Sequence, residues 1–349
     1  MARDLFIHIG LPKTGSTALQ TFFARNREAL LAKSVDYLPI GNFAEAKAGQ
    51  ISSGNGALLA RSMLPEKNEA YLPWNQERVS GAFKAAVAKS GAIAMLLSSE
   101  LFALAEVPAW SNLLTLCREF DLSVTFLAVL RNQCDWVSSS YLQRIKRHRL
   151  TQDSDEAIRR VYLEAKYLKY NTYFAALSPL VNGRIGLISY DQVSSKGLIP
   201  ATMSRIGITD MASFTLDKAP INITPSPEEI AFLRLCNQFS PDMTFSDVLA
   251  TPMANANHSA PSKRWTAINP ALREKIQANF AEENKNLQTT FSLPNDFFSE
   301  PCANYVNLEE VSISMPTLSM LLARYLTTYD RRIRALSGEV ASVKRAQHK

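Results

Sequence analysis

Four apolar runs of strand length, separated by longer stretches with helical spacing, constrain the fold of this chain most strongly. The runs are Asp4–Ile9, Ala92–Ser99, Val124–Leu130 and Arg184–Tyr190. A strand that is apolar along its whole length is buried on both faces, which is typical of a parallel sheet covered by helices. The sequence therefore predicts an α/β fold of three layers, with a central parallel sheet flanked by helices.

The stretches between and after these runs predict helices, and the one between Asp155 and Leu180 could be broken. A segment rich in Gly, Ser and Pro, from Gly41 to Trp74, is expected to be a long excursion over the surface. No repeat or low-complexity linker divides the chain, so we expect one domain over residues 1–310 and a basic helical tail over residues 311–349. The expected helices are Ser16–Ala32, Asp135–Arg149, Asp155–Leu180, Pro227–Gln238 and Pro270–Thr289.

The charge of the chain sets weak limits on its partners. With 349 residues and 46% hydrophobic side chains the chain can bury a sizeable core, and its net charge is +6. Most of this excess lies between Arg331 and Lys349, where six basic residues stand against Glu339. We expect no nucleic-acid partner, because the rest of the chain is nearly neutral, but anionic ligands are compatible with it.

The cysteines and the chain start bear on location. The four cysteines are too far apart in sequence for a zinc knuckle or a redox pair, so we expect ordinary reduced side chains, and no metal cluster is expected. The first residues contain no apolar core of a signal peptide, and no apolar run reaches the roughly 18–20 residues of a membrane span. The sequence predicts a cytoplasmic protein without a transmembrane span.

The tail has a heptad rhythm. Its apolar residues follow one another at alternating steps of four and three: Leu322, Leu326, Tyr329, Ile333, Leu336, Val340 and Val343. This spacing predicts a helix with one apolar seam. Three roles stay open, namely packing on its own domain, a homo-oligomer contact and contact with a membrane surface.

The segment GLPKTGST, Gly10 to Thr17, follows the first apolar run and opens a helical stretch. A strand-to-helix turn collects unpaired backbone N–H groups at the positive end of a helix, which suits an anion. An ATPase loop has a lysine directly after its second glycine, but here Ser16 follows Gly15 and the only lysine is Lys13. The loop is therefore suited to one phosphate that carries a leaving group, or else it is a turn without a ligand.

The run PKTGST resembles the first motif of the sulfotransferases that use 3′-phosphoadenosine 5′-phosphosulfate (PAPS), P-K-[ST]-G-[ST]-[ST]. The resemblance implies the P-loop sulfotransferase fold with PAPS as co-substrate and no metal requirement. It also implies that Lys13 neutralises the bridging oxygen as the S–O bond breaks, and that the loop holds the 5′-phosphate. The cofactor-binding residues implied in the loop are Pro12, Lys13, Thr14, Gly15, Ser16 and Thr17.

The same family predicts an arginine at the end of a later strand and a serine eight residues on, both binding the 3′-phosphate. Arg131 follows the run Val124–Leu130, Asn132 completes an R-N pair, and Ser139 stands eight residues after Arg131. A guanidinium presents a fixed fork of donors to a phosphate. Ser138 is a rival for the serine role, and a surface ion pair is the alternative role for Arg131.

A third region resembles the C-terminal part of bacterial carbohydrate-type sulfotransferases, in which a basic turn precedes a helix that covers the nucleotide. On this resemblance Lys263 and Arg264 bind the 3′-phosphate, although solvated loop charges are equally compatible with the sequence. The run ISYDQV also resembles the end of a late strand in many sulfotransferases. The likeness extends with gaps from Leu5 to about Phe291, so the tail lies outside it.

The general base is expected at the carboxyl end of a strand, where open α/β sheets place their ligands. Glu100 directly follows the run Ala92–Ser99 and is our candidate, provided that partial burial raises its pKa; capping the next helix is its alternative role. His8 is a second candidate, with packing beneath the loop as the alternative.

Together these observations predict a PAPS-dependent sulfotransferase that moves a sulfuryl group to a hydroxyl of a sugar or glycan. A P-loop kinase that uses ATP shares the fold and is the first rival. A non-catalytic nucleotide-binding scaffold that acts through its tail is the second.

Overall fold

The computed structural model describes residues 3–49, 53–152, 154–164, 166–193, 197–216, 225–239 and 264–347. These residues belong to two compact units that interleave along the chain. The first unit comprises Met1–Gln133, Lys166–Ile221 and Ala278–Glu300, and the second comprises Cys134–Ala165, Asn222–Gln277 and Pro301–Lys349.

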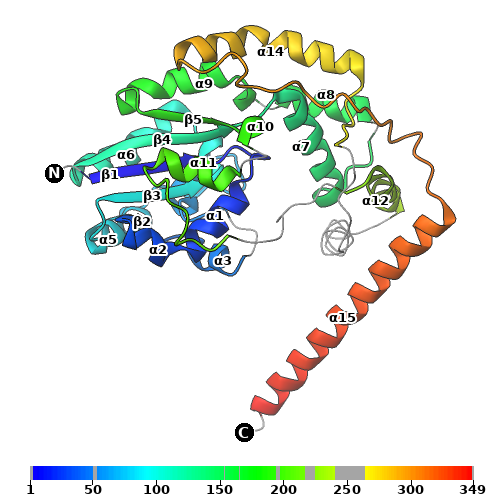
Figure 1. Cartoon of the computed structure of the whole chain (residues 1–349). Helices are drawn as coiled ribbons and strands as arrows, with labels where there is room; N and C mark the ends of the chain where they lie inside the picture. The colour runs from blue at the N-terminus through cyan, green and yellow to red at the C-terminus, as the bar shows by residue number, and fades with distance from the viewer. Residues whose placement is uncertain are drawn as a thin grey trace. The chain divides into compact units, whose positions relative to one another are not determined.

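The first unit is built on a five-stranded sheet in which every neighbouring pair is parallel, in the order β2-β3-β1-β4-β5 (Figure 1). This confirms the predicted α/β class and the central parallel sheet. The first strand lies in the middle, so the loop that follows it is flanked by the ends of two neighbours. The strands are β1 (Arg3–Ile9), β2 (Val35–Tyr37), β3 (Ala94–Ser99), β4 (Leu122–Leu130) and β5 (Ile185–Ser189).

One strand was not predicted. The edge strand β2 has only three residues, and its centre is a charged one, Asp36, which gives no apolar run to recognise. Asp36 is nevertheless buried, because Arg27 donates from Nε to its Oδ1 at 2.8 Å. A charge that is paired in this way can lie inside a sheet.

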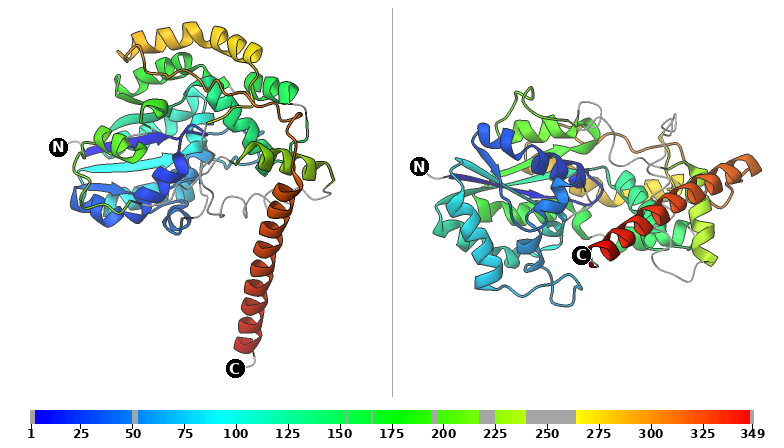
Figure 2. Two further views of the ribbon diagram at one scale, coloured as in Figure 1. Left: turned by 45° about the vertical axis from the view of Figure 1, so that its right-hand side comes forward. Right: turned by 90° about the horizontal axis from the view of Figure 1, so that it is seen from below.

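Helices α1 (Ser16–Arg25), α2 (Arg27–Ala32) and α11 (Leu198–Arg205) cover one face of the sheet (Figure 2). Their apolar side chains share one core with alternate residues of the strands, as Phe23 and Met203 do with Leu96. The long predicted helix Ser16–Ala32 is interrupted at Asn26. The Asn26 amide donates to the Thr215 carbonyl at 3.0 Å and accepts from the Thr215 N–H at 2.7 Å, a distant contact that local pattern does not reveal.

The opposite face of the sheet packs on α6 (Ser111–Glu119) and on the turn before it. The ring of Trp110 is fully buried there, 5.3 Å from Phe102 and 4.6 Å from Phe126 between ring centroids. With helices on both faces, the first unit has the predicted three layers.

The segment from Gly41 to Trp74 is not simply a surface excursion, contrary to our expectation. It forms the short helices α3 (Phe43–Lys47) and α4 (Ala57–Arg61). Within it, Asn55 is fully buried and Leu59 is 1% exposed. Gly54, Asn55 and Gly56 make close contacts with Ser98 of β3, so a composition typical of loops concealed an ordered segment.

The second unit is helical. It contains most of α7 (Gln133–Arg147), together with α8 (Ser154–Glu164), α12 (Pro227–Phe239) and α15 (Met315–Gln347). The expected break after Asp155 is present, because α8 ends before α9 (Tyr170–Leu177), and α14 (Pro270–Thr290) matches its predicted bounds closely. Arg234 of α12 forms a bidentate ion pair with Glu309, which ties this helix to the segment that leads into α15.

Candidate functional site

The candidate site lies at the carboxyl edge of the sheet in the first unit. The loop Gly10–Gly15 joins the central strand β1 to α1, between the ends of β3 and β4. Because all strands are parallel, Glu100 after β3 and Arg131 after β4 are at the same edge as this loop. Ligands of open α/β sheets bind at this edge.

The backbone of the loop is held in an unusual conformation. Lys13 and Gly15 both have positive φ, 67° and 85°. A non-glycine residue in this region is uncommon and is often part of a functional turn. Gly15 cannot be replaced without a shift, since an added Cβ would lie 2.4 Å from Cδ2 of Leu198.

Two hydroxyls of the loop hold the loop itself. Thr14 donates from Oγ1 to the Leu11 carbonyl at 2.6 Å, and Ser16 donates from Oγ to the same oxygen at 3.2 Å. Both side chains are buried, whereas Pro12 and Thr17 are half-buried. The geometry therefore favours backbone amides and Thr17, rather than the hydroxyls of Thr14 and Ser16, as groups that reach a ligand.

The start of α1 has no side-chain cap from the residues that the structure describes. Gly15 occupies its N-cap position, and no described side chain forms a cap hydrogen bond there. The first N–H groups of a helix lack intrahelical acceptors and carry the positive end of its dipole. This end of α1 is thus a natural place for a phosphate group.

Glu100 begins a 3-10 helix, Glu100–Leu104, directly after β3. Burial raises the pKa of its carboxyl, and the nearby Lys13 ammonium lowers it by a smaller amount. The helix is capped by Ser99, whose Oγ accepts from the Leu101 N–H at 3.2 Å, so the side-chain cap does not come from Glu100. A carboxyl with a raised pKa beside a lysine is suited to proton transfer.

Asn55 holds the end of β3 in place, and sequence reasoning did not single it out. Its amide donates to the carbonyls of Leu38 at 2.8 Å and Leu96 at 3.0 Å, and its Oδ1 accepts from the Ser98 N–H at 2.8 Å. The next residue, Gly56, donates its N–H to the Ser98 carbonyl at 3.0 Å. Asn55 thus fixes the backbone two residues before Glu100.

On the other side of β3, the loop approaches Glu100 directly. The N–H of Gly10 donates to the Ser99 carbonyl at 3.0 Å, and an added Cβ on Gly10 would lie 3.2 Å from both N and Cα of Glu100. The added Cβ would also lie 2.9 Å from Ser16 Oγ, so glycine at this position allows the two backbones to approach closely. The base candidate and the phosphate-type loop are in direct backbone contact.

His8 is fully buried within β1. Its Nδ1 lies 2.8 Å from Oγ of Ser98, and burial lowers its pKa to about 4. The side chain is therefore neutral near pH 7, and it has no exposed surface through which it could contact the hydroxyl of a substrate. This geometry favours the alternative in which His8 packs beneath the loop.

Arg131 connects the end of β4 to the loop. Its Nη1 donates to the backbone carbonyl of Lys13 at 3.2 Å, and its guanidinium carbon lies 5.0 Å from the ring centroid of Tyr190. Its Nε is buried and has no hydrogen-bond partner among the described residues. A buried cationic donor that lacks a partner is costly unless an anion binds it.

The neighbouring residues fix this arginine from several sides. The N–H of Asn132 donates to Asp191 at 2.8 Å, and Tyr170 donates from its hydroxyl to the Arg131 carbonyl at 2.9 Å. Asp191 and Tyr190 belong to the short helix α10 (Tyr190–Val193) after β5, within the run ISYDQV. The two motifs that the sequence singled out, R-N and Y-D, are therefore in contact.

The remaining predicted site residues belong to the second unit. Ser139 is half-buried on α7, whereas its rival Ser138 is buried and accepts the Ala267 N–H at 3.2 Å. Arg264 forms an ion pair with the buried Asp135, at the start of α7. Lys263 lies outside the described residues, so the predicted basic pair stays a prediction.

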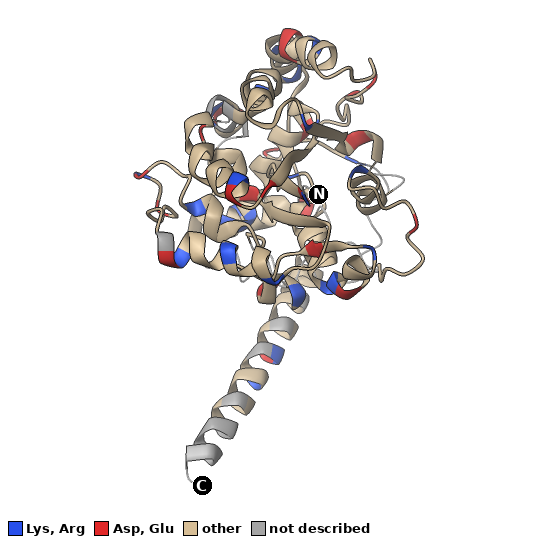
Figure 3. Ribbon diagram, turned by 90° about the vertical axis from the view of Figure 1, so that its left-hand side faces the viewer, with Lys and Arg blue, Asp and Glu red and all other residues tan. Residues whose placement is uncertain are grey.

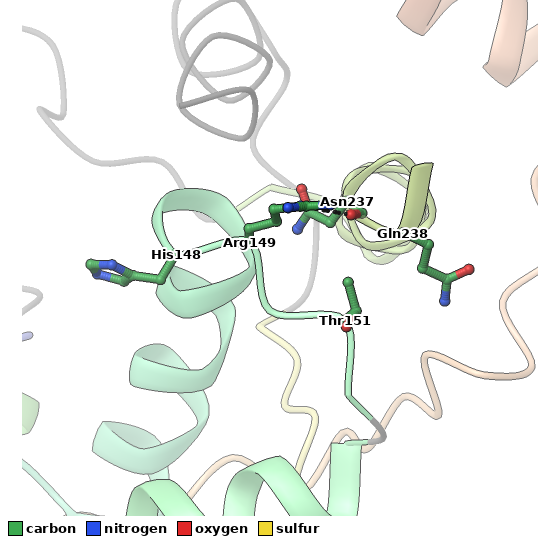
Figure 4. Close-up of a pocket in the computed structure, with 5 residues that line it drawn as sticks. All are labelled: His148, Arg149, Thr151, Asn237 and Gln238. Atoms are coloured by element: carbon green, nitrogen blue, oxygen red, sulfur yellow. Dashed lines mark hydrogen bonds between the residues drawn. The ribbon is translucent and has the colours of Figure 1, made fainter. Parts of the chain in front are cut away.

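A cavity of about 420 Å³ lies within the second unit, lined by His148, Arg149, Thr151, Asn237 and Gln238 (Figure 4). Arg149 has a φ of 51° and donates from Nε to the Asn237 carbonyl at 3.1 Å. Figure 4 shows the side chains of His148 and Gln238 directed away from each other. None of the predicted site residues lines this cavity, so we assign it no role in the proposed reaction.

No three His, Cys, Asp or Glu side chains in the described ranges come together in a way that could hold a metal ion. Among the helices described, none is long and apolar enough to cross a membrane. The four cysteines, all described, are free thiols in the structure.

No family model matches this chain, and no curated protein matches it in sequence. The function is therefore inferred from the residues at the carboxyl edge of the sheet.

Proposed function

We propose that this chain is a PAPS-dependent sulfotransferase with a P-loop sulfotransferase-like fold, acting on a hydroxyl of a sugar or glycan. The observation that carries the proposal is the position of Arg131. Its guanidinium reaches the carbonyl of Lys13 in the phosphate-type loop, and its buried Nε lacks a partner among the described residues. This arrangement fits a ligand with phosphate at both places.

The loop supports a sulfated nucleotide over a magnesium triphosphate. Its only lysine is Lys13, in the bend, whereas the position directly after the second glycine, where a kinase has its lysine, is Ser16 at the start of α1. The amides at the start of α1 would hold the 5′-phosphate, with Thr17 and Gly15 beside it. Arg131 would hold the 3′-phosphate, while Ser139, Lys263 and Arg264 stay predictions of the sequence resemblance.

The proposed reaction is one in-line substitution at sulfur. The acceptor hydroxyl oxygen forms a bond to sulfur, while the bond between sulfur and the bridging phosphate oxygen breaks. Glu100 takes the hydroxyl proton, and Lys13 stabilises the negative charge on the departing phosphate oxygen. Atoms and charges balance with 3′-phosphoadenosine 5′-phosphate as the second product, and no metal is needed for any of these steps.

Nucleotide binding is the first test. Calorimetry compares 3′-phosphoadenosine 5′-phosphate with adenosine 5′-phosphate and with ATP plus magnesium. We expect a loss of an order of magnitude or more, roughly 1.4 kcal/mol, when the 3′-phosphate is missing. In Arg131→Ala this preference should collapse, whereas Arg118→Ala, an exposed arginine of α6, should keep it.

Other outcomes would favour one of the two alternative functions, a kinase or a nucleotide-binding scaffold. A preference for magnesium ATP would replace the proposal by a small-molecule kinase. Binding of the 3′,5′-bisphosphate without sulfate transfer to any class of sugar, from PAPS labelled in its sulfuryl group, would point to a nucleotide-binding scaffold. Transfer that survives Lys13→Ala would refute the role of this lysine.

A further inference from the structure

Helix α15, Met315–Gln347, carries an apolar stripe that is open to solvent. The side chains of the stripe are between 43% and 62% exposed. They are Leu322, Leu326, Tyr329, Ile333, Leu336 and Val340. A continuous apolar surface of this kind is uncommon on a monomer and marks an interaction site.

The contact of α15 with its own unit uses a different face of the helix. Leu321 is only 1% exposed, and Tyr325, one turn later, is half-buried. Burial, then Tyr329 and then Cys236 of α12, raise the pKa of Tyr325, which places this tyrosine near α12. At about 100° per residue, this packing face lies roughly 90° around the helix from the stripe. Docking on the unit therefore leaves the stripe uncovered.

The spacing of the stripe indicates the kind of surface that covers it. Steps of four and three average 3.5 residues, the repeat of a helix that winds around another helix. Two apolar residues per heptad form a narrow seam, whereas a helix lying on a membrane has a wider apolar face. Residues of both signs of charge are present along α15 (Figure 3). Asp330 and Arg334 form an ion pair at 2.8 Å.

No other described helix offers a matching seam. The second longest, α14, has 21 residues, and its apolar side chains Leu272, Ile276, Phe280 and Leu287 are already buried. Apart from Met315 and Met320, which also belong to α15, the remaining exposed apolar residues of the described chain are scattered over several elements and form no heptad. Among the helices that the structure describes, a seam of this length and spacing occurs on α15 alone, so the matching seam that this chain can supply is that of a second copy of α15.

We propose that α15 joins two copies of this chain in a two-stranded coiled coil through Leu322, Leu326, Tyr329, Ile333, Leu336 and Val340. This assembly is independent of the proposed sulfotransferase activity, because none of these residues belongs to the candidate site.

The test is the mass of the full chain in solution, measured by light scattering and sedimentation over the micromolar range. We expect twice the 38.8 kDa of one chain. Leu326→Glu combined with Ile333→Glu should give a single chain. The control Thr327→Glu with Ala335→Glu adds the same charges at exposed positions on the side of the helix away from the seam and should stay dimeric. Circular dichroism checks that helix content is retained in both variants.

Three outcomes would overturn the proposal. The full chain could be a monomer at every concentration, or the Leu326→Glu and Ile333→Glu variant could remain a dimer. The chain could also be a monomer that binds phosphatidylserine vesicles through the stripe, with binding lost in the same variant. The last result would make the stripe a membrane-surface contact.

Discussion

The guanidinium of Arg131 lies over the ring of Tyr190, 5.0 Å from the ring centroid. The two residues follow adjacent parallel strands, β4 and β5, so the sheet register fixes the distance between their backbones. The ring supports the charged group from one side while Nη1 binds the loop on the other. The arginine is thus positioned before any ligand arrives.

Tyr190 should therefore contribute to nucleotide affinity through its ring alone. Tyr190→Leu removes the cation–π contact, worth about 0.5–2 kcal/mol, and should weaken binding of 3′-phosphoadenosine 5′-phosphate several-fold. Tyr190→Phe keeps the ring and should bind as the parent does. Calorimetry on both variants checks this, and an equal loss in the two would show that the hydroxyl matters instead.

Gly15→Ala should impair nucleotide binding and stability together. The positive φ costs an alanine about 1–2 kcal/mol, and its Cβ meets Leu198 at 2.4 Å. Gly207→Ala is a matched control, since Gly207 has a φ of 83° but nothing lies within 4 Å of its added Cβ. Urea unfolding of both variants separates backbone strain from the clash. Equal losses of stability would mean that Leu198 moves aside freely.

Glu100→Gln should abolish sulfate transfer, keep nucleotide binding and stabilise the fold at neutral pH. Burial raises the pKa of Glu100 above its usual 4.5 in the folded state. Between the unfolded and folded pKa values the folded chain holds the extra proton, so stability from this group falls as pH rises. The gain in folding stability in Glu100→Gln should therefore be present at neutral pH and vanish below the pKa of Glu100 in the unfolded chain.

The same carboxyl sets the expected pH dependence of the reaction. Transfer needs the ionised base, so kcat/KM should rise with pH through a pKa above the ordinary carboxyl range. Glu106→Gln, an exposed carboxyl after the same 3-10 helix, should leave both the profile and the stability unchanged. A Glu100→Gln enzyme with most of its turnover would refute the role of the base.

His8 should make the first unit sensitive to mild acid. Its folded pKa of about 4 lies below the ordinary 6.5, so the unfolded chain takes up the proton first as pH falls. The contribution to stability is complete above pH 6.5 and is lost as pH falls toward 4, amounting to about 3 kcal/mol. His8→Asn should flatten this part of the stability profile, whereas the exposed His148→Asn should not. An unchanged slope in His8→Asn would contradict the assignment.

Asn55→Ala should lower stability by about 2–5 kcal/mol, because it leaves the buried Leu38 carbonyl and Ser98 N–H without their side-chain partner. The effect should extend to kcat, since Ser98 leads directly to Glu100, while nucleotide affinity changes little. Asn68→Ala, which removes a turn hydrogen bond to Ala70 in the same segment, is the control. A loss of stability without any change in kcat would show that Asn55 does not position the base.

The parallel sheet could be predicted from the sequence, because four of its strands are continuous apolar runs that can be recognised without knowledge of tertiary contacts. The sequence was insufficient for β2, whose only distinctive residue, Asp36, is buried through an ion pair with Arg27. The break at Asn26 depends on Thr215, a partner 189 positions away. Local pattern cannot contain such distant pairs.

The candidate site, too, has residues that the sequence predicted and one that it did not. Lys13, Glu100 and Arg131 follow three strands that were recognised, so their shared edge follows from a parallel sheet. Asn55 lies in a segment of loop-like composition, and only an asparagine flanked by two glycines could have drawn attention to it. The cytoplasmic location, the domain boundary at residue 310 and the acceptor stay predictions of the sequence.

The close contacts of Gly54 and Gly56 restrict which substitutions the segment Gly54–Gly56 can accept. An added Cβ at Gly54 would lie 2.2 Å from the Ser98 carbonyl, and one at Gly56 would lie 2.6 Å from the ring of Phe102. These two glycines attach the segment Gly41–Trp74 closely to the end of β3 and the 3-10 helix after it. Directed evolution toward other acceptor hydroxyls should therefore tolerate substitutions in residues 65–74, which are largely half-buried or exposed. Substitutions at Gly54 and Gly56 should not be tolerated.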